Sequence, residues 1–427
     1  MHDSKSFVKG ALLLTLAGLI SKVLSAGYRI PLQNVTGDIG FYIYQQVYPI
    51  LGMASVLALY GFPAAVSKLA AEREMAGKQM SFTAFLLPVM IILLAIGLAI
   101  FGLLYTQADT LAEWIGDKRL IGGLRLAAFV FLLLPFSALL RGMFQANQQM
   151  QPTAYSQMAE QLVRVAIIIV VAVWLARTGA DPYMIASAAG VAAISGTVAA
   201  ILLLLVYVYR SKLHSPLRPL PTKEAIEWRY YLRTIVIFGM IQAVTHMMLL
   251  VIQLADTFTL LPNLLENGLS KLAAMQQKGI FDRGQPLIQF GSVLGSSFAL
   301  ALIPNIAKAH KKTKPSEMTD AIKIALAFGF YLAAGATLGL ILLFPEVNML
   351  LYENMRGTYS LQVLMASIVL SALCITAASI LQSLGYLKRT AVYMLLAFAC
   401  KWAANQFFVP MWGITELRLL PFWLYSC

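Results

Sequence analysis

Long apolar segments, each followed by a short polar one, repeat along almost the whole chain. A helix that crosses a hydrocarbon core of roughly 30 Å needs about 20 mostly apolar residues. Eleven segments reach this length, at 9–32, 42–67, 81–106, 121–144, 153–175, 183–208, 231–254, 284–305, 322–344, 360–383 and 390–409. This pattern predicts an all-α polytopic membrane protein.

Lys and Arg are concentrated in every second loop. Counted from the N-terminus and including the edges of the spans, these loops hold 19 basic residues, and the loops between them hold 8. Because cytoplasmic loops are richer in Lys and Arg, we expect a cytoplasmic N-terminus. The formal net charge of +13 then reflects topology, and we expect no nucleic-acid partner.

The composition supports this class and excludes several others. Of the residues, 59% are hydrophobic and 12% are charged, which is too apolar for a soluble globular protein. Cys374, Cys400 and Cys427 have neither disulfide-type nor zinc-type spacing. The sequence has no phosphate-binding G-x-x-x-x-G-K-[ST] loop, no H-E-x-x-H and no G-x-S-x-G. We therefore expect no enzyme, no cofactor and no metal site.

The chain also divides into two similar halves. The longest basic loop, 210–224, contains three prolines and follows the sixth segment. One constant shift along the chain superposes Gln145 on Gln382, Thr153 on Thr390, Ala154 on Ala391 and Arg164 on Lys401. We expect two pseudo-symmetric six-helix bundles around a central cavity, as in transporters with internal repeats. The first lobe would cover 1–209, a cytoplasmic linker 210–230, and the second lobe 231–415.

The last residues change in character. The segment that begins at Met411 starts like a further span and then becomes E-L-R-L-L-P-F-W-L. A one-base shift of a possible coding sequence for this stretch reads G-A-A-L-A-T-V-L-A, a small-residue helix. We therefore expect 416–427 to be a frameshifted tail and the second bundle to be truncated. The alternative is a naturally short chain whose last segment lies at the membrane interface.

Two of the expected spans keep polar residues on one helical face. The first span carries Gly18, Lys22, Ser25 and Arg29, and the seventh carries Gln242, His246, Gln253 and Asp256. At these spacings the side chains of each set share one face of a helix. Because ionisable groups are costly inside a membrane, we expect both faces to line a water-accessible cavity between the halves.

These residue types suggest roles in binding and coupling. The cations Lys22 and Arg29 suit an anion such as a diphosphate, and Ser25, Gln242 and Gln253 are further substrate-binding candidates. His246 and Asp256 are candidates for coupling to H⁺ or Na⁺. In the fifth span Glu160 and Arg164 lie one helical turn apart, which predicts a structural ion pair.

Two stretches in the first half carry a family resemblance. They are F-V-K-G-A-L-L-L-T-L-A-G-L-I-S-K-V-L-S-A-G-Y-R-I-P-L-Q near the N-terminus and G-F-P-A-A-V-S-K-L-A-A-E-R at the end of the second span. Both resemble the stage V sporulation protein B family of polysaccharide exporters. That family is part of the multidrug/oligosaccharidyl-lipid/polysaccharide (MOP) flippase superfamily, which includes the MurJ-type lipid II flippases. One departure is that 50–58 carries none of the arginines that MurJ-type flippases have in their second helix.

The resemblance implies two six-helix bundles and transport of undecaprenyl-diphosphate-linked sugars for cell-wall or polysaccharide synthesis by alternating access. We therefore expect a monomeric flippase for a lipid-linked oligosaccharide or lipid II-like precursor, surrounded by membrane lipids. One alternative is a multidrug or cation antiporter of the same fold, in which Asp256 would matter more than the cations. Another is a non-transporting membrane scaffold for wall synthesis, in which Lys22 and Arg29 would be dispensable.

Overall fold

The computed structural model describes residues 18, 20–77, 81–211, 227–311 and 315–412, and this part of the chain is helical and without strands. The first half contains α2 (Arg29–Val56), η1 (Leu57–Gly61), α3 (Phe62–Met75), η2 (Phe82–Leu86), α4 (Leu87–Thr106), α5 (Ala108–Ile115), η3 (Lys118–Leu120), α6 (Ile121–Ala128), α7 (Val130–Ala146), α8 (Met150–Thr178) and α9 (Met184–Arg210). The second half contains α10 (Trp228–Arg233), η5 (Thr234–Phe238), α11 (Gly239–His246), α12 (Met248–Glu266), α13 (Lys271–Asp282), α14 (Gly284–Lys311), α15 (Pro315–Leu342), α16 (Phe344–Tyr352), α17 (Thr358–Leu364), α18 (Ser367–Ser383) and α19 (Leu387–Trp412).

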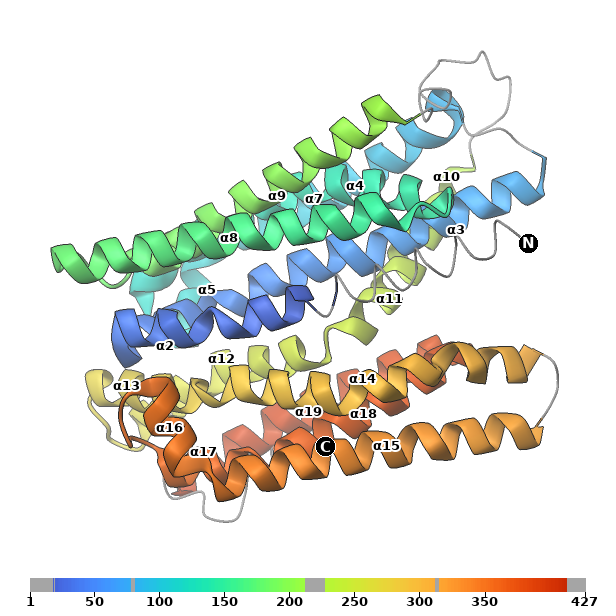
Figure 1. The fold of residues 1–427 in the computed structure, drawn as a ribbon. Coiled ribbons are helices and arrows are strands. Elements are labelled where there is room, and N and C mark those ends of the chain that lie inside the picture. Colours follow the sequence, from blue (N-terminus) through green and yellow to red (C-terminus); the bar gives the residue numbers. More distant parts are fainter. Residues whose placement is uncertain (1–17, 19, 78–80, 212–226, 312–314, 413–427) are drawn as a thin grey trace.

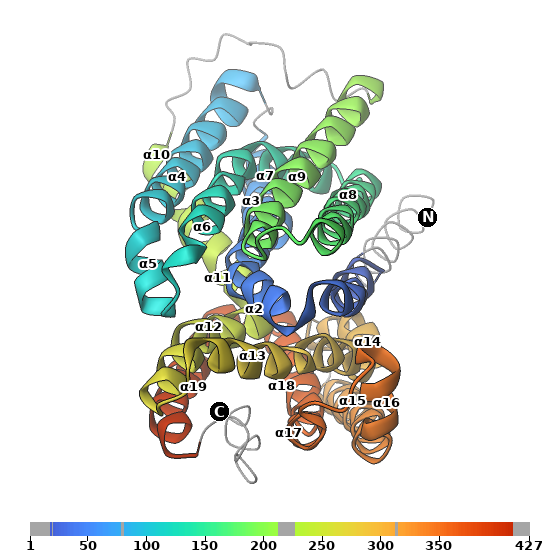
Figure 2. The same cartoon turned by 90° about the vertical axis from the view of Figure 1, so that its left-hand side faces the viewer.

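The helices form two bundles that lie side by side (Figures 1 and 2). One bundle contains α2 to α9, and the other contains α12 to α19. The segment from α10 to α11 runs along the first bundle, where α11 packs against η1 and α3, and α11 also contacts α19. The expected all-α membrane fold with two bundles is confirmed.

Nine continuous helical stretches among the described residues are long and apolar enough to cross a membrane. The first of these, Ile20–Met75, covers two expected spans because the chain turns at Gly37, which has a φ of 68°. Only a glycine adopts this backbone conformation without strain. The loop expected between the first two spans is therefore a tight turn between helices.

The seventh expected span differs from the prediction. Instead of one helix over 231–254, the chain forms α10, a π-helical turn, α11 and α12, with a break at Met247. The helix continues beyond the predicted end to Glu266. The polar residues on this segment therefore lie on two separate helices, and the expected single stripe is wrong.

The internal repeat is visible in the helix bounds. The shift that superposes Gln145 on Gln382 also brings both ends of α7 onto those of α18, and the start of α8 onto that of α19. The turns between them are also alike, because Gln148 and Gly385, at equivalent positions, both have positive φ. In both turns the following amide donates to a carbonyl further back, Gln149 to Phe144 and Tyr386 to Leu381, each at 2.9 Å. The two halves are therefore pseudo-symmetric.

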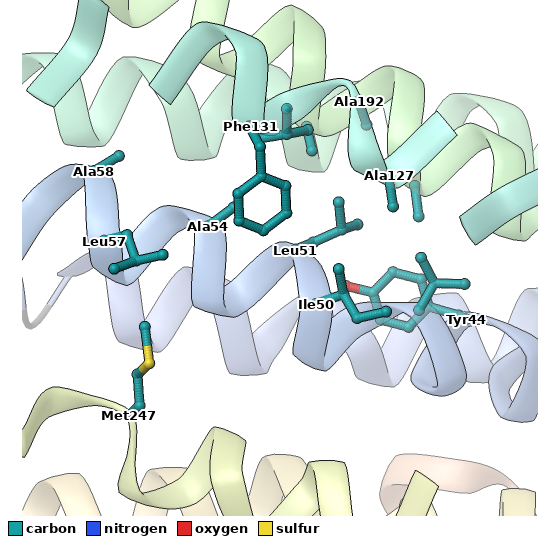
Figure 3. Close-up of a cluster of buried hydrophobic side chains, with 14 of the residues drawn as sticks. Tyr44, Ile50, Leu51, Ala54, Leu57, Ala58, Ala127, Phe131, Ala192 and Met247 are labelled. Atoms are coloured by element: carbon teal, nitrogen blue, oxygen red, sulfur yellow. The ribbon is translucent and has the colours of Figure 1, made fainter. Parts of the chain in front are cut away.

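Apolar side chains fill the first bundle around α2 (Figure 3). Leu51 and Ala54 of α2 pack with Phe131 of α7 and Ala192 of α9, and all four are buried. The first bundle and α11 meet closely where glycine removes side-chain volume. A Cβ atom on Gly61 would lie 2.9 Å from the carbonyl oxygen of Gly239, so η1 and α11 approach each other through small residues, as is common between membrane helices.

Two expected boundaries fall on the undescribed part of the chain. The linker expected at 210–230 lies largely outside the described residues, and the tail expected at 416–427 lies entirely outside them.

Candidate functional site

A buried guanidinium lies at the start of α2. Arg29 has no exposed surface, and its guanidinium carbon lies 3.8 Å from the centroid of the Tyr48 ring. The hydroxyl groups of Tyr28 and Tyr44 are hydrogen-bonded to each other beside it. Within the described part of the chain, none of the three guanidinium nitrogens has a hydrogen-bond partner and no carboxylate pairs with it. The cation is stabilised by aromatic rings instead of a counter-ion.

The other candidates of the first span lie just before α2, in the same helical stretch. Lys22 is exposed, and the hydroxyl of Ser25 lies 3.4 Å from that of Tyr48. From the second half, His246 stacks on Tyr60 with ring centroids 4.3 Å apart, and it lies within electrostatic reach of Lys22. The structure therefore brings Lys22 and His246 to the boundary between the bundles.

The remaining polar residues of the seventh span face another way. Gln253 donates to Gln285 of α14 at 3.1 Å, inside the second bundle. Asp256 is 1% exposed and accepts from Asn405 at 2.9 Å, and the Lys401 ammonium lies 3.1 Å from it. Both partners of Asp256 belong to α19, so this carboxylate joins two helices of the second bundle. Gln242 is half-buried on α11, which precedes the break at Met247, so it lies on a different helix from Gln253 and Asp256.

Glu160 lies at the centre of a buried cluster in the first bundle. It accepts from Arg164 at 2.7 Å and from Arg141 at 2.8 Å, and both arginines are buried. Arg141 also donates to the carbonyl of Ala58 at 3.2 Å, and Arg164 donates to the Ser55 hydroxyl at 3.0 Å. The cluster ties α7 and α8 to the segment around α2 and carries one excess positive charge. Sequence reasoning missed Arg141, which lies near the end of an apolar span.

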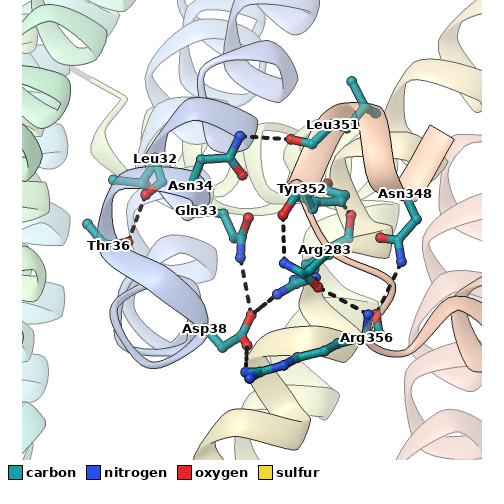
Figure 4. Close-up of polar contacts among 11 residues, drawn as sticks. Leu32, Gln33, Asn34, Thr36, Asp38, Arg283, Asn348, Leu351, Tyr352 and Arg356 are labelled. Carbon is teal, nitrogen blue, oxygen red and sulfur yellow. Dashed lines mark hydrogen bonds and ion pairs between the residues drawn. The ribbon is translucent and has the colours of Figure 1, made fainter. Parts of the chain in front are cut away.

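A second group that sequence reasoning missed joins the two bundles (Figure 4). Asp38, just after the turn at Gly37, accepts from the Arg283 guanidinium, with Nε at 3.0 Å, and lies 3.6 Å from Arg356. Arg283 is 1% exposed, and the side chain of Asn34 donates to the carbonyl of Leu351 at 2.8 Å. Asp38 and Asn34 come from the first bundle, and their partners come from the second. The available signal was an acidic residue beside a glycine in a short loop.

A further carboxylate of the first bundle is held in the same manner. Asp117 has no exposed surface, and it accepts from Lys271 of α13 at 2.8 Å and from the Tyr183 hydroxyl at 2.5 Å. Burial and the neighbouring Asp117 charge raise the pKa of the Tyr183 hydroxyl, which therefore stays protonated as a donor. We call the ion pairs of Asp38 with Arg283 and Arg356, and of Asp117 with Lys271, the outer contact, because the predicted topology places them on the extracytoplasmic side.

The outer contact requires a glycine on α13. A Cβ atom at Gly279 would lie 2.1 Å from the carbonyl oxygen of Asp38. We expect Gly279→Ala to push α13 away from α2 and to lower the melting temperature of the detergent-solubilised protein. The matched control is Gly335→Ala on α15, where a Cβ atom would meet nothing within 4 Å. Equal melting temperatures for the two variants would contradict this close approach.

Comparisons with known proteins agree with this architecture. The model of the polysaccharide biosynthesis protein family matches residues 7–310. The uncharacterized membrane protein YabM of Bacillus subtilis (strain 168) is 38% identical over 411 residues, which are 96% of this chain and 76% of that protein. The lipid II flippase MurJ and stage V sporulation protein B of the same organism are each 32% identical, over 175 and 167 residues, which are 39% of this chain and 32% of either relative.

Solved structures show the same fold. An inward-facing multidrug resistance MATE family transporter of the MOP superfamily has a TM-score of 0.69 at 14% identity, covering 97% of this chain and 90% of its own. The outward-facing conformation of such a transporter has a TM-score of 0.62 at 13% identity, and the match covers 98% of this chain and 91% of that transporter. Since the family model matches more than half of its residues, the chain belongs to the polysaccharide biosynthesis protein family and is a multi-pass membrane protein with the fold of the MOP transporters.

Proposed function

We propose that this chain is a flippase that moves a lipid-linked glycan precursor, carried on a polyprenyl diphosphate, across the bacterial cell membrane. The observation that carries the proposal is Arg29, a guanidinium that is buried in a membrane-spanning segment and has no described carboxylate partner. Lys22 precedes it by about two helical turns in the same helical stretch.

An unpaired cation in a membrane span is costly, so its retention calls for a function. A diphosphate supplies the missing negative charge and offers oxygen atoms that a guanidinium can bind in a bidentate manner. Lys22 adds a flexible point charge and is exposed, so it is open to an incoming headgroup. We further propose that Ser25 and Gln242 add neutral hydrogen bonds to the headgroup. In this proposal Gln253 belongs to the packing of the second bundle, because Gln285 binds it.

The arrangement of the bundles supports alternating access. The outer contact joins them on the side predicted to be extracytoplasmic, through ion pairs that can separate as the bundles rock apart. The relatives point to the same substrate class, since one of them is named a lipid II flippase. We further propose that the N-terminus is cytoplasmic and that the chain acts as a monomer.

An antiporter is the second candidate, and one observation favours it. Asp256 and Lys401 form a buried pair inside the second bundle, and a proton or Na⁺ that neutralised Asp256 would release Lys401. His246, an exposed residue at the end of α11, is a second titratable candidate for coupling. Either group also suits a flippase that is coupled to H⁺ or Na⁺, so only the substrate distinguishes the two candidates.

Transport of a fluorescent short-chain polyprenyl-diphosphate sugar in proteoliposomes tests the proposal. We expect Lys22→Gln to lower the initial rate by on the order of tenfold, because the exposed ammonium binds the diphosphate directly. Lys22→Gln combined with Arg29→Gln should abolish transport.

Lys323→Gln, which removes an exposed cation from α15, is the control and should transport at the wild-type rate. Melting temperatures show whether each variant folds. Wild-type transport in the Lys22→Gln variant would refute the cationic site. Transport of an organic cation instead of the diphosphate, lost in Asp256→Asn, would establish the antiporter.

A further inference from the structure

A groove of about 530 Å³ opens between the two bundles at the end predicted to be cytoplasmic. One side is formed by Lys68 of α3, and the other by the turn between α18 and α19 together with the first turn of α19, which includes Lys388 and Arg389. Arg233, at the end of α10, contributes from the segment that runs along the first bundle. Among the described residues, four cations therefore line the groove, and no acidic residue does.

Three of these cations have no acidic partner in the part of the chain that the structure describes. Arg233, Lys388 and Arg389 are exposed, and none of them forms an ion pair with a described residue. Lys68 lies 4.0 Å from Glu72, but the Glu72 carboxylate also accepts a hydrogen bond from the Tyr230 hydroxyl. The positive charge of the groove is thus largely uncompensated.

The internal repeat shows that these charges are not needed for the fold. The equivalent turn between α7 and α8 has the same backbone hydrogen bonds, yet Gln151 and Pro152 occupy the positions of Lys388 and Arg389. Both cations lie in the first turn of α19, where the helix dipole disfavours positive charge. Their presence therefore opposes the local stability of α19. It follows the excess of Lys and Arg in cytoplasmic loops, and the uncompensated charge also suits a negatively charged ligand.

Aromatic and aliphatic side chains share the groove with the cations. The Lys68 ammonium lies 4.5 Å from the centroid of the Phe238 ring, and the Arg389 guanidinium lies 4.9 Å from that of Tyr386. The aliphatic side chains of Ile237 and Ile241 also line the groove. Basic pockets between membrane helices on the cytoplasmic side suit the phosphate groups of lipids, whose chains need such an apolar surface.

We propose that this groove is a binding site for the phosphate group of a lipid at the cytoplasmic surface of the membrane. Resting on the proposed function, the site holds the diphosphate of the substrate at the entrance, before the headgroup reaches Lys22 and Arg29. Because the cations come from both bundles, a bound phosphate joins the two bundles at this end.

Lipid binding to the full chain in phosphatidylcholine nanodiscs, measured by native mass spectrometry, tests the site. Three probes are titrated separately: undecaprenyl diphosphate, dioleoyl phosphatidylglycerol and inorganic pyrophosphate. We expect Lys388→Gln with Arg389→Gln to weaken undecaprenyl diphosphate binding on the order of tenfold, from the loss of two cations near the membrane surface. The control Lys323→Gln should change it less than about twofold. Since both substituted cations are exposed, the double variant should melt at or above the wild-type temperature.

The three probes distinguish the sources of the phosphate. A loss confined to undecaprenyl diphosphate supports the substrate as the occupant, and an equal loss for phosphatidylglycerol supports lipid phosphates in general. A loss for pyrophosphate alone overturns a lipid occupant, and unchanged binding of all three probes overturns the site.

The outcomes for the flippase proposal and for the groove can be told apart. Unchanged lipid binding in the double variant of a chain whose wild type transports overturns only the groove. Weakened binding in a chain whose wild type does not transport supports the groove and overturns the flippase.

Discussion

Replacing Asp38 by alanine is expected to separate the two bundles at the outer contact. The substitution leaves Arg283, which is 1% exposed, without its carboxylate, and Arg356 loses the same partner. Breaking one side of a buried ion pair costs roughly 3–5 kcal/mol, because the remaining charge stays buried and unpaired. Opening of the bundles hydrates Arg283 and relieves this cost. A difference of about 3 kcal/mol corresponds to a shift on the order of 100-fold toward the open arrangement.

Electron–electron distances between spin labels measure this shift. Labels at Thr178 of the first bundle and Leu350 of the second occupy exposed positions at the end predicted to be extracytoplasmic, in a background without the native cysteines. We expect a longer distance to dominate in Asp38→Ala. Asp109→Ala is the control, since Asp109 pairs with Arg125 within the first bundle at an exposed site. An unchanged distance distribution in Asp38→Ala would show that this ion pair does not hold the bundles together.

Glu160→Ala is expected to destabilise the first bundle strongly. It leaves both Arg141 and Arg164 without a carboxylate, and their side chains are only 1% and 9% exposed. The expected cost is again about 3–5 kcal/mol, seen as a large fall in the melting temperature of the purified protein. Glu160→Gln should restore part of the loss, because the amide oxygen still accepts a hydrogen bond.

The exposed pair of Glu113 and Lys118 provides the matched control. Their side chains are 56% and 73% exposed, so Glu113→Ala should leave the melting temperature nearly unchanged. Comparable falls in Glu113→Ala and Glu160→Ala would mean that burial does not set the strength of the Glu160 cluster. A normal melting temperature together with lost transport in Glu160→Ala would instead assign Glu160 to the transport path.

The two ends of the molecule differ in how their charges are arranged. At the outer contact, each carboxylate of the first bundle pairs with at least one cation of the second, so every charge there has a partner within the protein. At the opposite end, the groove brings described cations from both bundles together without a described acidic residue. Paired charges can hold one end closed, whereas unpaired cations need a ligand to join the other.

The fold could be predicted in large part because hydropathy and repetition are local properties of the sequence. A hydrophobic stretch of sufficient length forms a helix in a membrane, since all of its backbone groups must be paired internally. The constant shift between the halves, inferred from four matched pairs such as Gln145 and Gln382, agrees with the bounds of α7 and α18. The break at Met247 was not predicted, because no proline or glycine marks it. The helices that α11 packs against, η1 and α19, are also distant from it in sequence.

The candidate site could be predicted only in its parts. The sequence placed Lys22 and Arg29 on one helical face, and it placed Glu160 within reach of Arg164. It could not assign Asp256, whose partners Lys401 and Asn405 lie in a distant part of the chain. The role of each remaining candidate stays a prediction.

By itself, the sequence determined that this chain is a helical membrane protein built from two similar halves. The length of the apolar segments and the constant shift between the halves can both be read directly from the order of residues. Only the tertiary structure decided which charges are paired. Asp38 meets Arg283 across 245 positions, and Arg29 meets aromatic rings instead of a carboxylate. The strength of a charge in a membrane depends on its burial and on its nearest partner, and both are set by how the helices pack.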